Sequence, residues 1–319
     1  MKRTLILTTT CGLLAVLATR PAKAQTINPG VIDPTSTYAG KTYSEWSAGF
    51  WQYYMSLAAT NNPFVYNPSY PVSPLGTGQS GPVWFLCGNY ANGGTHAYTN
   101  TIPGGIALFA GITDIERDNS GCPASSFSQA QLRASAKSDE DTAANMTCTV
   151  DGVAVNGLDD VLTAPYRVQS TVFNYVSPPV HNILHDLFGE TCYQNASGTP
   201  PYTINGAVED GVFLLIAPLS VGAHVIHTTC AFPSFSFVAN FTHYLTVEPV
   251  ALTVNASAQS GNLVLSWPQT PDNYTVQSSP SLSPTDWQPA NLVVTTNNGT
   301  LQATAPVGTT NKLFRLQLN

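Results

Sequence analysis

Charged side chains are scarce in this sequence: Asp, Glu, Lys and Arg make up 9% of its 319 residues. Soluble domains usually carry about a quarter. Exposed helix faces need Glu, Lys and Arg, so the shortage argues against a mainly helical fold and excludes coiled coils and basic nucleic-acid-binding arms. The polar surface must instead consist of Ser, Thr, Asn and Gln, which suits twisted sheets joined by turns.

Several catalytic and cofactor motifs are also missing. The sequence has no Gly-x-Ser-x-Gly elbow, which excludes a standard α/β-hydrolase. It has no P-loop, and no Gly-x-Gly-x-x-Gly follows a predicted strand, so nucleotide cofactors are not expected. Without a Cys-x-x-Cys pair, neither a thioredoxin-like redox site nor a zinc ribbon is supported.

The first 24 residues are typical of a secretory signal. Lys2 and Arg3 precede a short apolar run from Leu5 to Leu17, and Ala22-Lys23-Ala24 forms a small-x-small cleavage site. The alternative, an uncleaved membrane anchor, needs about 20 apolar residues, and no later segment is long and apolar enough either. We therefore expect cleavage near Ala24 and a protein that is secreted, periplasmic or at the cell surface.

Cleavage would change the charge balance. Four of the 11 basic residues leave with the signal, so seven remain against 18 acidic residues and the formal charge becomes −11. All of this excess lies before residue 250. A protein this acidic repels phosphate backbones, so nucleic acid is not expected as a partner.

The cysteine pattern predicts disulfides. Cys11 leaves with the signal, and in an oxidising compartment the other cysteines favour two bridges and one leftover thiol, in 15 possible arrangements. The leftover thiol is either a nucleophile or, as we favour, a buried inert side chain. The remaining cysteines are Cys87, Cys122, Cys148, Cys192 and Cys230.

Helical signals are few. Thr42 to Leu57 predicts an amphipathic helix that begins with the capping box Thr42-x-x-Glu45. Its aromatic stripe indicates packing onto a sheet or, alternatively, a ligand-binding aromatic face. A second capping box predicts a helix from Ser128 to about Ala144, and a short helix is expected from His181 to Phe188.

Most of the remaining chain alternates between apolar runs of strand length and turn residues, so residues 25–249 predict a β-sandwich or jelly-roll domain with two or three helices. Asp151-Gly152 predicts a tight hairpin. The expected strands are Pro82 to Cys87, Ile106 to Ile112, Thr147 to Val155, Tyr166 to Val176, Gly211 to Ile216, His224 to Thr229 and Phe235 to Val247, and the expected turns between them include Asp210-Gly211.

After Glu248-Pro249, residues 250–319 predict a second, small β-sandwich domain. Leu263-Val264-Leu265-Ser266-Trp267-Pro268, followed by Tyr274-Thr275-Val276-Gln277, is similar to the B and C strands of a fibronectin type III-like domain. Such immunoglobulin-like modules occur as accessories at the C-terminus of many secreted bacterial proteins. The resemblance implies a spacer or an attachment module.

The main domain resembles a family of uncharacterised exported bacterial proteins over roughly residues 40–247. The resemblance implies export and a shared fold, and it implies no reaction. The segments that carry it are Tyr43-x-x-Trp46, Phe50-Trp51-Gln52-Tyr53, Gly81 to Leu86, Ile102 to Phe109, Val150 to Val153, Tyr166 to Ser170, Asp210-Gly211 and Pro218 to His227.

Two metal sites are conceivable. His181 and His185 would lie one turn apart on a helix and could hold Zn or Cu together with His224 or, alternatively, His227. The other interpretation is two exposed polar residues.

The second candidate is an acidic segment, in which Asp114, Glu116 and Asp118 alternate along a predicted loop as Ca ligands do. The segment lacks the EF-hand glycine and glutamate, and a solvated acidic turn is the alternative.

Four residues are candidates for catalysis: Glu45, Glu116, Arg167 and Asp210. A pair such as Glu45 and Glu116 could serve glycoside hydrolysis if the fold brought the two carboxylates together. Arg167 is more simply a partner in a buried ion pair.

The leading hypothesis is an exported protein that binds a glycan or another surface ligand. An extracellular metal-dependent or carboxylate-based enzyme acting on a polymer is the rival, and a structural envelope component is the third possibility.

Overall fold

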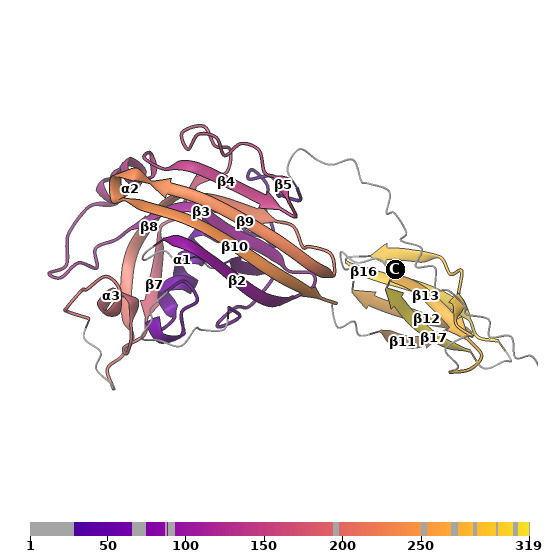
Figure 1. Ribbon diagram of the computed structural model, residues 1–319. Helices are drawn as coiled ribbons and strands as arrows, with labels where there is room; N and C mark the ends of the chain where they lie inside the picture. The colour runs from indigo at the N-terminus through magenta and orange to yellow at the C-terminus, as the bar shows by residue number, and fades with distance from the viewer. Residues whose placement is uncertain are drawn as a thin grey trace, which may run out of the picture.

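The expected signal sequence (1–24) and Cys87 lie outside the part of the chain that the structure describes. The computed structural model describes residues 29–65, 75–86, 88, 93–193, 198–249, 254–268, 274–282, 286–297, 299–308 and 312–318. These residues form mostly β-structure with three α-helices, so the prediction of a mainly all-β sandwich fold with few helices is confirmed. The arrangement is drawn in Figure 1.

Two five-stranded sheets form the body of residues 29–249. The first, here called the helix-covered sheet, has the order β1-β3-β8-β6, and β7 also pairs with β8. Its strands are β1 (Val83–Leu86), β3 (Ala107–Arg117), β6 (Arg167–Gln169), β7 (Phe173–Ser177) and β8 (Tyr202–Ile216). The second, here called the threonine sheet, has the order β2-β10-β9-β4-β5. Its strands are β2 (Gly94–Pro103), β4 (Ala144–Val150), β5 (Val153–Ala154), β9 (Gly222–Phe232) and β10 (Phe237–Glu248).

Apolar side chains from both sheets meet in one hydrophobic cluster. Leu108 and Leu214 come from the helix-covered sheet, and Ile226 and Leu245 come from the threonine sheet. All four are at most 2% exposed. The two sheets therefore pack face to face as a sandwich.

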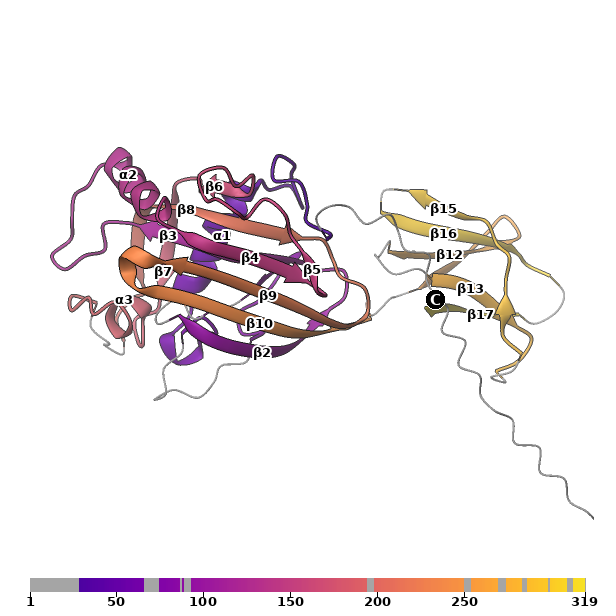
Figure 2. The same ribbon diagram turned by 45° about the horizontal axis from the view of Figure 1, so that its top comes forward.

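Helix α1 (Tyr43–Ser56) covers the other face of the helix-covered sheet (Figure 2). Both halves of the predicted capping box form, because Thr42 accepts from the backbone of Glu45 and Glu45 accepts from the backbone of Thr42. The aromatic stripe faces the sheet, where the Phe50 ring centroid lies 5.6 Å from that of Phe213 and 5.8 Å from that of Phe85. The stripe is therefore a packing face.

Strand β8 lies at the centre of this layered arrangement. From Ala207 to Ile216 every residue is buried, since α1 covers one face and the threonine sheet covers the other. The sequence suggests a turn at Asp210-Gly211, but both residues lie inside this strand. A Cβ at Gly211 would come 2.5 Å from the carbonyl oxygen of Thr113, so the glycine permits close approach of the neighbouring strand at its bulge.

Local turn and cap predictions are mostly confirmed. The Asp151-Gly152 hairpin joins β4 and β5, with φ of +51° and +78° at these two residues. Helix α2 (Gln129–Glu140) begins after its predicted cap Ser128, although it ends earlier than the sequence suggested. The run Tyr166 to Val176 forms two strands, β6 and β7, instead of one, and both pair with β8.

The predicted short helix is the least accurate element. Helix α3 (Ile183–Asp186) begins after the N-cap Asn182, and His181 precedes it with φ of +52°. His181 and His185 are therefore not on one helical face, as the sequence interpretation required.

Residues 254–318 contain two further sheets, with orders β11-β12-β16-β15 and β14-β13-β17. Their small hydrophobic cluster includes Leu265, Trp267, Val276 and Ala303. The strands are β11 (Asn255–Gln259), β12 (Asn262–Pro268), β13 (Tyr274–Ser279), β14 (Gln288–Pro289), β15 (Val294–Asn297), β16 (Thr300–Pro306) and β17 (Leu313–Leu318). The 3-10 helices η1 (Ala59–Asn61) and η2 (Pro233–Phe235) complete the described elements.

Among the described helices, none has the length and apolar character to cross a membrane.

Candidate functional site

The outward face of the threonine sheet carries many small polar side chains. Figure 2 shows the face of β4, β9, β10 and β2 with no described helix or strand in front of it. Residues on these strands alternate between the core and this face. The outward positions are Thr95, Ala97, Thr99 and Thr101 on β2; Val238, Asn240, Thr242, Tyr244, Thr246 and Glu248 on β10; Ala223, Val225, His227 and Thr229 on β9; and Asn145, Thr147 and Thr149 on β4.

Strand register aligns these outward side chains in rows across the sheet. One row crosses four strands as Thr95, Asn240, Thr229 and Thr147. The parallel pairing of β2 with β10 extends these rows to the Thr-rich edge strand, because the residues of β2 lie opposite those of β10 in an unbroken register. The face therefore presents hydroxyl and amide groups at the regular spacing of a β-sheet.

Hydrogen bonds within the face hold several of these groups in place. The hydroxyls of Thr147 and Thr229 lie 2.7 Å apart, and the Thr229 hydroxyl donates to the backbone oxygen of Asn145 at 2.9 Å. The Nε2 atom of His227 lies 2.8 Å from Oδ1 of Asn240. Cross-strand pairs of this kind order side chains before any ligand arrives.

Tyr244 stands in the middle of this face with 50% of its surface exposed. Its neighbours across the sheet are Thr99 on β2 and Val225 on β9. Among the outward positions of these described strands, Glu248 is the only charged side chain. The face combines one exposed aromatic ring with neutral hydrogen-bonding groups and with the exposed apolar side chains of Val225 and Val238.

The acidic residues expected on a loop instead lie at the end of β3. Asp114 and Glu116 belong to the strand, so the loop prediction is wrong, and Asp118 follows it directly. Asp118 accepts hydrogen bonds from the Tyr175 hydroxyl and, at 2.7 Å, from the backbone N–H of Ser120. No group of three or more His, Cys, Asp or Glu among the described residues is arranged to hold a metal ion.

Burial raises the pKa of three glutamates well above the ordinary value. For Glu209 the main cause is burial, and the neighbouring Asp114 adds to it. For Glu116 the cause is burial followed by the charge of Asp118. Burial also raises the pKa of Glu140, although the hydroxyl of Thr113 donates to its carboxylate and opposes the shift.

The candidate catalytic residues do not converge on one site. Glu45 is exposed and its carboxylate accepts hydrogen bonds from Thr42, which lower its pKa. Arg167 lies elsewhere, 2.7 Å from Asp210 and 2.7 Å from Asp141. Asp210 is 2% exposed and also accepts from Gln169 at 2.9 Å. The geometry of Arg167 is that of a structural ion pair.

Two of the three candidate histidines share one carboxylate. The Nδ1 atoms of His181 and His185 lie 3.1 Å and 2.8 Å from the two oxygens of Asp186. His224 belongs to a different cluster, since its Nδ1 lies 2.8 Å from Asp151 and its Nε2 lies 2.8 Å from the backbone oxygen of Ser220. The structure brings together His181 and His185 but does not bring His224 to them.

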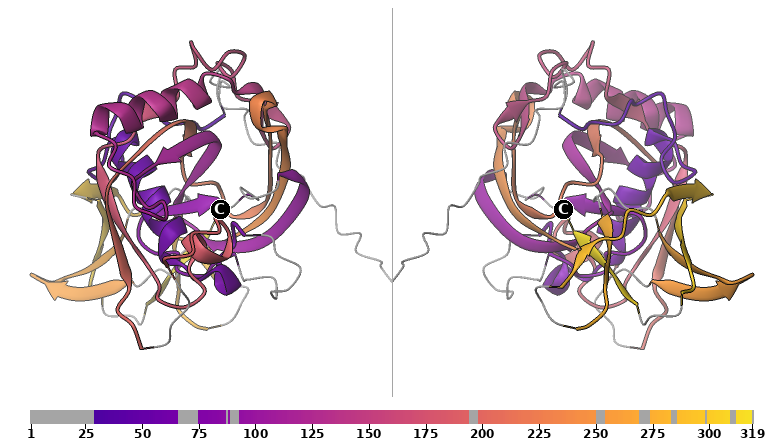
Figure 3. Two further views of the ribbon diagram at one scale, coloured as in Figure 1. Left: turned by 90° about the vertical axis from the view of Figure 1, so that its left-hand side faces the viewer. Right: turned by 90° about the vertical axis from the view of Figure 1, so that its right-hand side faces the viewer.

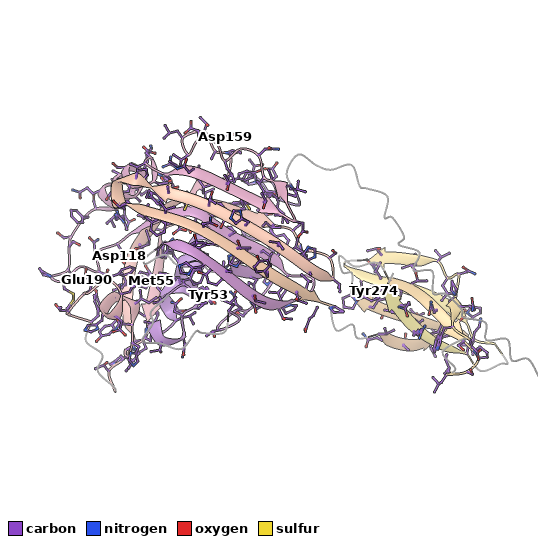
Figure 4. The ribbon with its side chains drawn as sticks, in the orientation of Figure 1. Tyr53, Met55, Asp118, Asp159, Glu190 and Tyr274 are labelled. Carbon is purple, nitrogen blue, oxygen red and sulfur yellow. A yellow bond between two sulfur atoms is a disulfide. The ribbon has the colours of Figure 1, made fainter. Side chains whose placement is uncertain are left out.

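One disulfide forms among the described cysteines, between Cys122 and Cys192. It lies at the end of the sandwich where Asp118 and Glu190 are labelled in Figure 4, and Glu190 accepts a hydrogen bond from the backbone of Cys122 at 2.7 Å. Cys148 and Cys230 are buried free thiols. Burial raises the pKa of each to about 12, so neither is a ready nucleophile.

The outward face of the threonine sheet was not predicted from the sequence, for an identifiable reason. Strand β2 (Gly94–Pro103) contains few apolar residues and was not expected as a strand. The available signal was the alternation of Thr95, Thr99 and Thr101 with His96, Tyr98 and Ile102. Only the pairing with β10 shows that this alternation belongs to a strand of the sheet.

Comparisons with known proteins give no family. No family model matches the chain, and no curated protein matches it. Matching solved structures include PbICP-C in complex with falcipain-2 (11% identity, 53% of this chain and 100% of that chain, TM-score 0.20). A chimeric titin Z1Z2-Z1Z2 tandem matches at 11% identity over 70% of this chain and 93% of that chain, with a TM-score of 0.17. A structure of ICOS with ICOS-L and an anti ICOS-L VNAR domain matches at 10% identity over 71% of this chain and 94% of that chain, with a TM-score of 0.22. Likenesses at these TM-scores are too weak to support an argument about function.

Proposed function

We propose that this protein is an exported bacterial binding protein that attaches to a neutral polysaccharide through the outward face of the threonine sheet. The observation that carries the proposal is the exposed ring of Tyr244 among aligned Thr, Asn and His side chains. The signal sequence and the C-terminal fibronectin type III-like module fit a protein that works outside the cell, with the module as a spacer or attachment point.

The chemistry of a polysaccharide matches both kinds of group on this face. The C–H groups of a sugar ring pack against an aromatic face, and Tyr combines such a face with a polar hydroxyl. Sugar hydroxyls both donate and accept hydrogen bonds, as do the Thr hydroxyls and the side chains of Asn240 and His227. Rows of such groups along a sheet suit an extended chain better than a compact ligand.

The charge of the protein and of this face favours a neutral polysaccharide over an anionic one. The full sequence has a formal charge of −7. The outward face offers Glu248 and no Lys or Arg in the described strands. An anionic polysaccharide would be repelled, because nothing on the face compensates its charge.

The test uses the protein with both its main domain and its C-terminal module. Purified protein is mixed with insoluble neutral polysaccharides of several kinds, and the bound fraction is measured after washing. We expect retention on at least one of them, and a loss of roughly tenfold in affinity for Tyr244→Ala, which corresponds to about 1.4 kcal/mol.

Phe127→Ala is the matched control. Phe127 is another exposed aromatic residue, 54% exposed, and it lies before α2, away from the threonine sheet. This variant should bind as the wild type does. Retention that is unchanged in Tyr244→Ala, or absent from every polysaccharide with the folded wild type, would overturn the proposal.

A further inference from the structure

A cavity of about 430 Å³ lies between the two sheets of the sandwich. Its walls come from the end of β3, from β9 and β10, and from η2, and Phe188 after α3 completes them. Figure 3 (left) views the molecule from its side where α2 and α3 lie. The volume is within the range of small-molecule sites in proteins.

Aromatic rings dominate the lining. The five phenylalanines are Phe188, Phe232, Phe235, Phe237 and Phe241. Phe232 and Phe241 are buried at 5% and 7% exposure, whereas Phe188 and Phe235 are 49% and 51% exposed. Buried rings inside and exposed rings outside indicate a mainly apolar interior with an accessible rim.

The polar side chains of the lining come from Thr113, Asp114, Arg117 and Cys230, and Asp114 is buried at 8% exposure. Cys230 contributes a thiol whose pKa burial raises to about 12, so it stays protonated. Thr113 donates its hydroxyl to Glu140. Arg117 is the one cationic side chain among the lining residues, and its side chain is 34% exposed.

Arg117 is held in position by three neighbours. Its guanidinium donates to the backbone oxygen of Glu116 at 2.7 Å and to the Ser135 hydroxyl at 3.2 Å, and it pairs with Asp139. A guanidinium has five N–H donors in a planar fork, so a carboxylate at the rim can join this arrangement.

We propose that this cavity binds a single-chain fatty acid, with the hydrocarbon chain between the phenylalanine rings and the carboxylate at Arg117. The site is separate from the polysaccharide face: the phenylalanines of β9 and β10 that line it point inward, whereas Tyr244 and its neighbours point outward. Burial of the chain supplies the driving force, since burying apolar surface from water stabilises the complex.

The test measures binding of dodecanoic and hexadecanoic acid to the full chain by displacement of a fluorescent polyene fatty acid. Ala239 lines the cavity on β10 and is 2% exposed, so Ala239→Phe fills the space. Its matched control is Val238→Phe, on the same strand but 61% exposed on the outward face. We expect binding to weaken at least tenfold in Ala239→Phe and to stay unchanged in Val238→Phe.

A separate experiment tests whether the fatty-acid carboxylate binds at Arg117, by comparing an acid with the corresponding alcohol. Arg117→Gln should weaken binding of hexadecanoic acid several-fold while leaving binding of hexadecanol unchanged. An equal change for the acid and the alcohol would overturn the role of Arg117.

A measurement on the wild type keeps the proposal falsifiable if Ala239→Phe does not fold. A diazirine-bearing fatty acid is photolysed with the full chain, and labelled peptides are mapped by mass spectrometry. Labels on the lining segments of β3, β9 and β10 support the site. No displacement of the polyene probe by either acid, or labels confined to other segments, overturns it. Retention on polysaccharide in the same preparations reports separately on the proposed function.

Discussion

Glu116 and Glu209 lie directly opposite each other on the neighbouring strands β3 and β8, so two carboxyl side chains share one face of the sheet. Like charges at opposed positions destabilise a sheet. Burial raises the pKa of both groups, which means that the fold retains protons the unfolded chain releases.

The raised pKa of Glu209 makes stability depend on pH in a definite direction. Above the ordinary glutamate pKa of 4.5 the unfolded chain loses its protons while folded Glu209 keeps its own, so the free energy of unfolding falls as the pH rises toward the raised folded pKa. Glu209→Gln is neutral at every pH. We expect this variant to unfold like the wild type near about pH 4 and to be more stable by ~1–3 kcal/mol near about pH 8.

Urea unfolding at the two pH values measures the effect. Glu248→Gln is the control, since Glu248 is exposed at the end of β10 and its neutralisation should change little. A Glu209→Gln variant that is less stable than the wild type at both pH values would contradict the argument.

Removing Arg167 should destabilise the fold strongly. Its guanidinium lies 2.7 Å from the nearly buried carboxylate of Asp210. Arg167→Met leaves that charge unpaired, which costs ~3–5 kcal/mol, whereas the double variant Arg167→Met/Asp210→Leu should recover most of the loss. A thermodynamic cycle over the single and double variants measures this coupling. Additive losses would show that the pair does not act as a unit.

The Cys122–Cys192 disulfide should contribute measurably to stability. It links two segments 70 residues apart in sequence, and closing a loop of that length is worth ~4 kcal/mol in the unfolded state. Cys122→Ser/Cys192→Ser should lower the midpoint of denaturation. Reductant should shift the wild type toward the same midpoint and should have little effect on the variant. A reductant effect that persists in the variant would place the redox-sensitive bond elsewhere.

The N-terminal cap of α1 should also be measurable. Thr42→Ala removes the acceptor for the backbone N–H of Glu45 and should cost ~1 kcal/mol, whereas Thr42→Ser keeps the hydroxyl and should cost little. Polysaccharide retention should be the same in both variants once folding is allowed for, because α1 covers the opposite side of the sandwich from the threonine face. Selective loss of retention in Thr42→Ala would argue for a role of this helix in binding.

Structural features that depend on residues close together in the sequence, such as helix caps and tight turns, could be predicted. The capping boxes at Thr42 and Ser128 and the Asp151-Gly152 hairpin formed as expected. By contrast, β2 was missed, because an edge strand rich in Thr shows little apolar signal.

The candidate site could be predicted only in part. The hypothesis that His181, His185 and His224 converge failed for two reasons. The helix begins two residues after His181, and His224 on its strand bonds to Asp151 and Ser220 instead. Distances between residues far apart in sequence follow from strand order and register, and neither is encoded in local spacing.

The amino-acid sequence alone predicts the composition of the surface and the fold class, because it has few charges, many hydroxyl and amide side chains, and alternating runs that indicate a mainly β fold. These properties follow from the chemistry and period of neighbouring residues. Tertiary packing established which threonines form one face, where five phenylalanines line a cavity, and that Glu116 lies opposite Glu209. Those relationships arise because long-range pairing and sheet packing choose one register among many that the local pattern allows.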